Sequence, residues 1–303
     1  MNTLARAAWL RLAVAAAAFL AATAAPAQGK ADAEIEAAFE AAKQTAVQGP
    51  SDVMLADQAT LKLPEGFVYV PPAEGKRIMT AMGNRVGAGL LGLVFPGDDP
   101  DANWFVVMSY VDSGYIRDDD AKDWDADELL GNLKAGTEEA NRDRKARGIA
   151  EMEVLGWVEA PRYDAAAHRL VWSAATKDKS EAGAMPRGVN YNTYALGRQG
   201  YISLNLVTEY ATIAKDKPLA HRLLGALEFN TGRRYADFDS STDRVAEYGL
   251  AALVGGFAAK KLGLFATLGV LLAKFWKVIA IAGVGLVAGL GKVLARKKAD
   301  ENG

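Results

Sequence analysis

Hydrophobic and polar positions form several different patterns along the chain. The first is a charge-free, almost wholly apolar run over Leu12–Ala25. Helical spacing of apolar residues follows at 31–47, and after Gly49-Pro50 apolar and polar residues alternate in short runs. Helical spacing returns in three later segments, at 73–82, 126–147 and 217–227. The sequence from 248 to 299 is strongly apolar and holds no acidic residue and no proline.

The alternating runs predict strands that pair as antiparallel hairpins. Turn residues separate them at Asp57-Gln58, Pro96–Pro100, Pro161–Asp164 and Gly197–Gly200. The predicted strands cover 53–56, 60–63, 67–70, 90–95, 104–111, 152–159, 169–176, 189–196 and 201–208. Because hairpins, not single strands, alternate with helices, the pattern predicts an α+β fold with a mainly antiparallel sheet and several packed helices. A doubly wound parallel sheet is disfavoured.

The first apolar run predicts an N-terminal signal peptide over residues 1–27. Arg6 and Arg11 supply its basic start, and small residues at Ala25 and Ala27 match the positions that a signal peptidase reads. We therefore expect cleavage after Ala27. The alternative, a permanent N-terminal anchor, is disfavoured because 14 residues fall short of the roughly 20 that a spanning helix needs.

The C-terminal part predicts a transmembrane helix over residues 275–295 and a basic cytoplasmic tail at 296–303. An aromatic pair, Phe275-Trp276, opens the helix, and Arg296-Lys297-Lys298 closes it. Because basic flanks face the cytoplasm, the residues before 275 are placed outside, as a signal peptide also requires. We expect a single-pass protein of the cytoplasmic (inner) membrane, with its main domain on the extracytoplasmic, periplasmic side and membrane lipid as a partner.

Residues 248–274 precede this helix and leave three alternatives open. The segment is apolar but is cut by Lys260-Lys261, so it is an interfacial or membrane-embedded segment, one half of a helical hairpin, or a segment packed on the preceding domain. Within the predicted transmembrane helix, Gly285 and Gly289 are spaced as Gly-x-x-x-Gly. This spacing lets two helices approach closely and predicts homo-oligomer contacts, although glycine is also common in membrane helices generally.

Charge separates an acidic body from basic ends. The whole chain carries −2; residues 1–27 contribute +2, residues 248–299 contribute +8, and Asp300 with Glu301 contributes −2, which leaves −10 for the predicted domain at 28–247. Nucleic acid is therefore not an expected partner, because Lys and Arg are needed to neutralise its phosphates. The chain also has no cysteine, which excludes disulfides, thiolate metal sites and a lipid-modified cysteine.

Residues 87–92 match Gly-x-Gly-x-x-Gly, the spacing of a dinucleotide-binding loop. That site needs a strand before the glycines and a helix after them to receive the pyrophosphate. Here a Gly83-Asn84 turn precedes them and a predicted strand follows. We therefore expect a tight turn with close backbone packing, and no cofactor.

An acidic cluster between 118 and 128 offers oxygen ligands of the kind that calcium prefers. Its candidate metal ligands are Asp118, Asp119, Asp120, Asp123 and Asp125. The spacing breaks the calcium-loop pattern, however, because Glu128 stands where the loop needs glycine. Asp125 and Glu128 also fit a capping box at the start of the helix at 126–147, and this interpretation is preferred to a metal site.

No catalytic residue is assigned from the sequence. The two histidines, His168 in a predicted hairpin turn and His221 on a predicted helix, stand alone in the sequence. The motifs of serine hydrolases, phosphate-binding loops and zinc proteases are missing. A carboxylate pair brought together by the fold stays open as a route to hydrolysis.

A polar face is predicted on two neighbouring strands. Asn190, Asn192 and Tyr194 alternate along one strand, and Ser203 and Asn205 are expected to oppose them across the hairpin. The face either lines a ligand groove, formed by Asn190, Asn192, Tyr194 and Asn205, or is the solvated side of a sheet whose other face is core.

Several short blocks, in order, resemble a bacterial family of predicted membrane-anchored proteins that contain a domain of unknown function. The blocks are Leu63–Gly66, Met82–Asn84, Ser113–Tyr115, Asp118–Ala121, Gly156-Trp157, Val189–Thr193, Leu196–Arg198, Tyr235–Phe238 and Ala246–Gly249. The resemblance covers nearly the whole chain after residue 27. It implies the same layout of an exported domain and a C-terminal apolar region, and it supplies no catalytic residue.

Together these features favour a non-catalytic binding or scaffolding domain outside the cytoplasmic membrane. Its expected partner is an envelope protein or a cell-wall component. Two alternatives stay open: a membrane-tethered hydrolase that uses a carboxylate cluster, and an accessory subunit of a membrane complex.

Overall fold

The computed structural model describes residues 33–84, 86–97, 102–146, 148, 150–180 and 188–255. The predicted signal peptide, the predicted transmembrane helix at 275–295 with Gly285 and Gly289, and the tail at 296–303 lie outside the described residues. Within those ranges, no helix combines the length and apolar character needed to cross a membrane.

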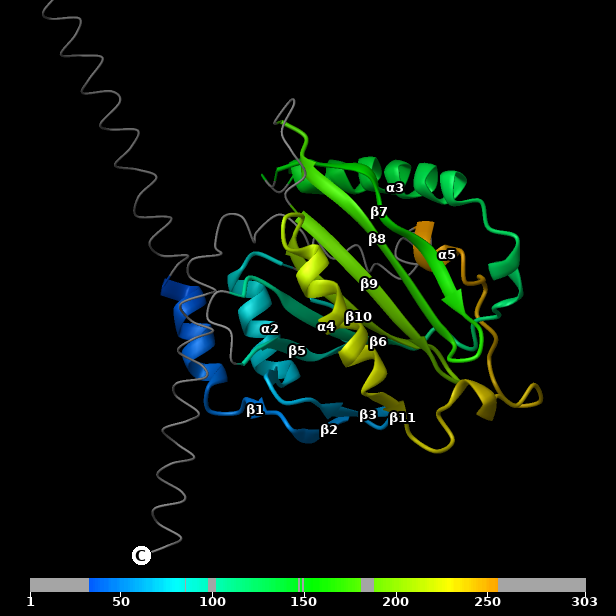
Figure 1. The fold of residues 1–303 in the computed structure, drawn as a ribbon, viewed down its shortest axis with the longest axis horizontal. Coiled ribbons are helices and arrows are strands. Elements are labelled where there is room, and N and C mark those ends of the chain that lie inside the picture. The colour runs from blue at the N-terminus through cyan, green and yellow to red at the C-terminus, as the bar shows by residue number, and fades with distance from the viewer. Residues whose placement is uncertain are drawn as a thin grey trace, which may run out of the picture.

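An eight-stranded antiparallel sheet forms the centre of the molecule (Figure 1). Across the sheet its strands are β1 (Val47–Gln48), β4 (Phe67–Val70), β5 (Leu90–Pro96), β6 (Phe105–Val111), β10 (Tyr201–Glu209), β9 (Gly188–Leu196), β8 (Arg169–Asp178) and β7 (Met152–Asp164). The pairing of β6 with β10 joins the two halves of the sequence and places Ser109 opposite Ser203. The predicted mainly antiparallel sheet is confirmed.

A smaller sheet and several helices complete the α+β fold. The small sheet has the order β11 (Leu227–Phe229), β3 (Ala59–Leu63) and β2 (Ser51–Leu55). The helices are a segment over 33–42, α2 (Pro72–Ala81), α3 (Ala126–Ala146), α4 (Ile213–Gly225) and the short α5 (Ala252–Gly255), with 3-10 turns η1 (Asp119–Lys122) and η2 (Tyr235–Asp237). These elements confirm the predicted hairpins at β2–β3 and β9–β10 and the helices predicted near 73–82, 126–147 and 217–227.

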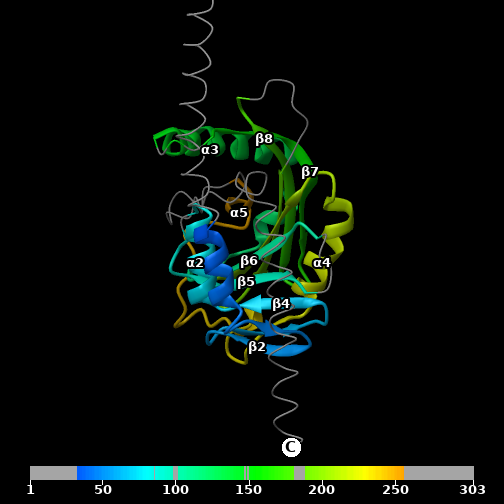
Figure 2. The same cartoon turned by 90° about the vertical axis from the view of Figure 1, so that its left-hand side faces the viewer.

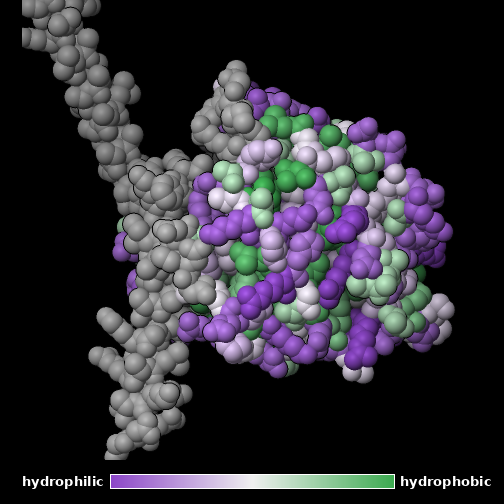
Figure 3. Space-filling model, viewed as in Figure 1, coloured by the Kyte–Doolittle hydropathy of each residue, from purple (hydrophilic) through white to green (hydrophobic). Residues whose placement is uncertain are grey.

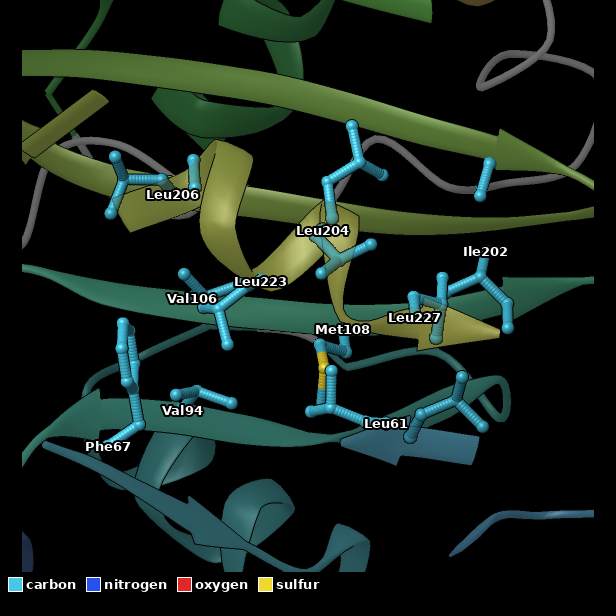
Figure 4. Close-up of a cluster of buried hydrophobic side chains, with 14 of the residues drawn as sticks. Leu61, Phe67, Val94, Val106, Met108, Ile202, Leu204, Leu206, Leu223 and Leu227 are labelled. Carbon is cyan, nitrogen blue, oxygen red and sulfur yellow. The ribbon is translucent and has the colours of Figure 1, made fainter. Parts of the chain in front are cut away.

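One face of the large sheet is closed by α4 and the small sheet. Alternate residues of the central strands, such as Met108, Leu204 and Leu206, meet Leu223 of α4 and Leu61 of the small sheet in one apolar cluster (Figure 4). Met108, Leu204 and Leu206 are each at most 1% exposed. Outside this layer, the face that carries α4 is covered largely by hydrophilic residues (Figure 3). The layer between this face of the sheet and α4 is therefore a closed apolar core.

The opposite face is covered at its two ends by different helices. At the β4–β5–β6 end, the helix over 33–42 and α2 form one apolar cluster that includes Phe39 and Ile78. At the β7–β8–β9 end, α3 and α5 form another that includes Leu129, Trp172 and Leu253. Figure 2 shows α2 and α5 on one side of the sheet and α4 on the other. The middle strands thus lie between two separate apolar clusters.

Several element boundaries differ from the sequence prediction. The helix predicted over 31–47 ends at residue 42 and Val47 begins β1, while α4 begins at Ile213 and not at 217. The predicted turn at Pro161–Asp164 is wrong, because β7 continues through it and the hairpin turn falls at 165–168. A proline is tolerated there because β7 is an edge strand and its register shifts between Glu159 and Arg162. After Glu247, Leu250 and Val254 are 0% exposed and belong to an apolar cluster of the domain.

Candidate functional site

A cavity of about 300 Å³ lies on the second face of the sheet, between the two apolar clusters. The neighbouring strands β6, β10 and β9 form its floor. Its walls come from α2, α3, α5 and the outer strands. Its floor residues are Ser109, Asn190, Asn192, Ser203 and Asn205, and its walls include Met79, Val107, Leu133, Val154, Trp172, Tyr194, Tyr201 and Leu253. The cavity therefore lies over the centre of the sheet, between α2 at one end and α3 and α5 at the other.

Strand register brings the polar floor residues together. Asn205 of β10 lies directly opposite Asn192 of β9, and Ser203 lies opposite Tyr194 on one side and Ser109 on the other. The Ser203 hydroxyl donates to the Ser109 carbonyl at 3.4 Å, and Asn192 Nδ2 donates to the Asn190 carbonyl at 3.1 Å. The predicted opposition across the hairpin is confirmed. All four predicted groove residues, Asn190, Asn192, Tyr194 and Asn205, line this one cavity.

Aromatic rings form part of the cavity wall. The Tyr194 and Tyr201 rings meet edge to face with centroids 5.6 Å apart, and the Tyr194 hydroxyl donates to the Leu253 carbonyl of α5 at 3.4 Å. Burial raises the pKa of both tyrosines well above the usual range, which keeps their hydroxyls neutral. These two rings are uncharged, and the Tyr194 hydroxyl connects this part of the wall to α5.

The cavity lining carries no formal charge. Among the described residues that line it, none is Asp, Glu, Lys, Arg or His. Its polar side-chain groups are carboxamides and hydroxyls, which both donate and accept hydrogen bonds, and the indole N–H of Trp172, which only donates. The cavity can therefore bind by shape and neutral hydrogen bonds, and none of its described lining residues would compensate a buried ligand charge.

One carboxamide on the floor is incompletely bonded. Asn205 Oδ1 is buried and accepts no hydrogen bond from the described part of the chain. The terminal torsion of an asparagine is broad and roughly two-fold, and turning the amide breaks no hydrogen bond of Oδ1 to the described residues. Asn205 can therefore reorient its amide toward a bound molecule.

Helix α5 is fixed to the domain by Asp120. The backbone N–H groups of Leu250 and Ala251 donate to Asp120 Oδ1 and Oδ2 at 3.1 and 3.0 Å. Gly249 permits this approach, because a Cβ there would lie 2.4 Å from Asp120 Oδ2. The side chains of Ala252, Leu253 and Val254 then join the cavity wall. Sequence reasoning missed this contact, which joins positions about 130 residues apart.

The structure does not gather the candidate metal ligands into one site. Asp118 accepts a 2.6 Å hydrogen bond from the Tyr163 hydroxyl, and Asp120 holds α5. Asp125 Oδ1 accepts from the N–H groups at 127 and 128, which confirms its predicted capping role. Asp119 and Asp123 are exposed. Within the ranges that the structure describes, no group of three or more His, Asp or Glu side chains is placed to hold a metal ion.

The two histidines lie in separate polar clusters outside the cavity lining. His168, in the predicted hairpin turn, stacks on Tyr235 with ring centroids 4.1 Å apart, and its Nδ1 lies 3.2 Å from the Tyr163 hydroxyl. Tyr163 lies between His168 and Asp118, and burial first and this carboxylate second raise its pKa. The cluster packs η2 against the β7–β8 hairpin.

His221 forms a second cluster between α4 and the sheet. Its Nε2 lies 2.8 Å from the Tyr191 hydroxyl, which donates to Glu159 Oε2 at 2.8 Å, and Lys217 forms an ion pair with the same carboxylate. Burial is the main cause that lowers the pKa of His221. Burial also raises the pKa of Glu159, but hydrogen bonds from Lys217 and Tyr191 outweigh it and lower that pKa overall. No sequence motif signals this grouping.

The Gly-x-Gly-x-x-Gly stretch leads into a strand. Residues 87–89 precede β5, which begins at Leu90, so no helix start follows the glycines. A Cβ on Gly89 would lie 2.1 Å from the Tyr110 carbonyl oxygen. The predicted tight turn with close backbone packing is confirmed at this position. Gly87 and Gly89 also lie at the cavity edge.

Comparisons with known proteins give one family and a remote structural likeness. The family model described as "Protein of unknown function (DUF2167)" matches residues 47–285. No curated protein matches the chain. Among solved structures, the chain is similar to the solution structure of cyanobacterial PsbP (CyanoP) from Synechocystis sp. PCC 6803, with 10% identity, 61% of this chain and 92% of that chain covered, and a TM-score of 0.36. A likeness of this size carries no argument about function.

Proposed function

The chain belongs to the DUF2167 family of proteins of unknown function, and from this premise we propose that it is a membrane-anchored envelope protein with a non-catalytic binding domain. The domain lies outside the cytoplasmic membrane, and its cavity over β6, β10 and β9 binds a small uncharged molecule. The signal peptide and C-terminal transmembrane helix that the sequence predicts support this placement.

The observation that carries the proposal is the composition of the cavity. Asparagine and serine side chains converge on the floor of a hollow whose walls are mainly apolar and aromatic, which is the usual arrangement of a small-molecule site. A solvated sheet face would not be covered by helices at both ends, as this one is. The cavity is thus better explained as a binding site than as an ordinary polar surface.

The carboxylates favour binding over hydrolysis. Hydrolysis by a carboxylate pair needs two such groups on either side of a substrate bond. Asp118, Asp120 and Asp125 instead accept hydrogen bonds from three different parts of the chain, and none of them lines the cavity. These carboxylates therefore do not support the hydrolase alternative.

A fluorescence experiment tests whether the cavity binds a small neutral molecule. The full chain in lipid nanodiscs is titrated with the uncharged dye aminoanthracene, and empty nanodiscs supply the background. We expect saturable fluorescence enhancement for the wild-type chain. A Ser203→Phe variant places a ring on the cavity floor and should lose the saturable part, because the volume that the dye needs is filled.

The matched control introduces the same ring away from the cavity. Ser51→Phe lies in β2 of the small sheet and should retain wild-type binding. Thermal unfolding of both variants checks that they fold. Equal dye binding by wild type and Ser203→Phe, with both folded, would show that the dye does not use the cavity and would contradict the proposal.

A further inference from the structure

We propose that the ligand of this cavity is an uncharged amphiphile, with an apolar body and a head group that both donates and accepts hydrogen bonds, such as a carboxamide. The inference rests on the proposed function and names the class of ligand. Three features carry it: the absence of charge among the described lining residues, the concentration of carboxamides and serine hydroxyls on the floor, and the lack of a hydrogen-bond donor for Asn205 Oδ1 among the described residues.

The lack of charged side chains in the described lining favours an uncharged ligand. A carboxylate, phosphate or ammonium group that entered the cavity would lose its water and meet no oppositely charged side chain among the lining residues that the structure describes. Burying an unpaired charge is strongly unfavourable, whereas a neutral amide or hydroxyl loses far less. Anionic lipid headgroups and free phosphate are therefore poor candidates for this site.

The distribution of polar groups selects an amphiphile. Ser109, Ser203 and Asn205 sit on β6 and β10, and Asn192 and Asn190 continue the same floor onto β9. The walls carry mainly apolar side chains, for example Met79, Leu133 and Val154. Two wall hydroxyls, those of Thr137 and Thr176, already donate to backbone carbonyls. A molecule that fits both surfaces has its polar atoms on one side and an apolar body on the other.

The volume limits the size of that body. About 300 Å³ is at the lower end of the range for small-molecule sites, which reaches roughly 1,000 Å³. A single short chain or small ring system fits this space better than a lipid with two long acyl chains. The ligand is thus a small amphiphile.

The floor chemistry selects a head group that both donates and accepts. Asparagine carboxamides and serine hydroxyls each do both, so a carboxamide head can pair with them in either direction. Asn205 Oδ1 is buried and accepts nothing from the described residues, so once the amide has turned toward the cavity a ligand N–H can use this oxygen without displacing a protein donor. A head group that only accepts would leave this oxygen unused.

Three probes with the same alkyl chain separate these features. Octanamide has a neutral head with donors, methyl octanoate has a neutral head without donors, and octanoate is charged. The full chain in nanodiscs is dialysed to equilibrium against each probe, and retention by empty nanodiscs is subtracted. We expect octanamide to bind about five- to tenfold more tightly than methyl octanoate, as one net hydrogen bond provides, and octanoate to bind at least about tenfold more weakly than the ester.

A variant pair assigns the head-group preference to one residue. Asn205→Leu removes the carboxamide and keeps a similar volume, so octanamide and methyl octanoate should then bind with nearly equal affinity. Asn103→Leu is the control, because Asn103 lies outside the lining and its amide donates to Glu209. It should leave the preference for octanamide unchanged.

Each other outcome overturns a defined part of the argument. Octanoate binding as tightly as octanamide would remove the selection for neutrality, and equal binding of amide and ester to the wild-type chain would remove the role of the donor. If aminoanthracene binds in the cavity and none of the three probes does, the ligand class is wrong but the proposed function stands. If the dye also fails to bind, the proposed function itself falls.

Discussion

The two faces of strand β10 show how differently one strand can be used. Ile202, Leu204 and Leu206 point into the closed core under α4, while Ser203 and Asn205 point into the cavity. The strand alternates apolar and polar residues, which usually indicates one buried and one solvated face. Here helices cover both faces, and they cover the polar face only at its ends. Coverage by distant elements, not the alternation itself, turns a polar face into the floor of a cavity.

The largest expected effect comes from the closed face. Leu204 is 1% exposed and packs in the α4 core, so Leu204→Ala should lower the free energy of unfolding by about 3 kcal/mol through lost burial and a residual hole. Its neighbour Ser203 faces the cavity, and Ser203→Ala should cost less than about 1 kcal/mol. Chemical denaturation of both variants measures this contrast. Similar losses at the two positions would mean that the faces are packed alike.

The attachment of α5 is the next largest effect. Asp120→Ala removes the acceptor of two backbone N–H groups and should cost about 1 kcal/mol, as loss of a helix cap does. Loss of this contact should loosen the cavity wall, and amide hydrogen exchange at 250–254 should therefore accelerate. Asp119→Ala, at an exposed neighbouring position, is the control. Unchanged exchange in α5 after Asp120→Ala would argue against this attachment.

A smaller effect of opposite sign is expected on the cavity floor. Asn205→Leu removes a buried oxygen that accepts no hydrogen bond from the described residues, so the free energy of unfolding should stay equal or rise by up to about 1 kcal/mol without ligand. The same variant should lose the octanamide preference. Thermal and chemical unfolding test the stability. A clear loss of stability would show that Asn205 is a structural residue in the ligand-free protein.

The smallest effect is the pH dependence of the free energy of unfolding. It distinguishes the two faces because His221 titrates on the α4 face. Burial lowers the pKa of His221 below its ordinary value of 6.5, so the unfolded chain binds more protons between the two values. The contribution of His221 to stability is complete above about pH 6.5 and is lost as the pH falls through the lowered folded pKa. The free energy of unfolding, measured between about pH 5 and 7.5, should therefore fall as the pH falls, and this slope is the expected result.

Variants on the two faces provide the control for that slope. His221→Gln keeps a hydrogen-bonding side chain next to Tyr191 but does not titrate, so the slope should be smaller. Asn205→Leu on the cavity face should leave it unchanged, because the described cavity lining has no group that titrates in this range. A slope that survives in His221→Gln would have to come from another group.

Local patterns predicted the elements well where local forces decide them. The β9–β10 hairpin follows from period-two alternation around Gly197–Gly200, and the capping role of Asp125 follows from its position before a helix. The β7 boundary was missed because Pro161 normally ends a strand, and only its place at the sheet edge makes it tolerable.

The cavity depends on contacts that no local pattern contains. Asn192 and Asn205 were predicted to face each other, but the sequence could not decide between a solvated face and a groove. That decision needs α2 and α5, whose residues Met79 and Leu253 are far from both asparagines in sequence. The pairing of Ser109 with Ser203 likewise spans 94 residues. Such placement follows from the whole fold.

The close contact between Gly249 and Asp120 has a consequence for evolution. A Cβ at 249 would lie 2.4 Å from Asp120 Oδ2, so neither residue is free to change alone without loss of the contact. Among sequences of this family, we expect positions 120 and 249 to vary together: aspartate with glycine, or both replaced. Relatives with a larger residue at 249 and an aspartate at 120 would have to hold the end of the domain in another way.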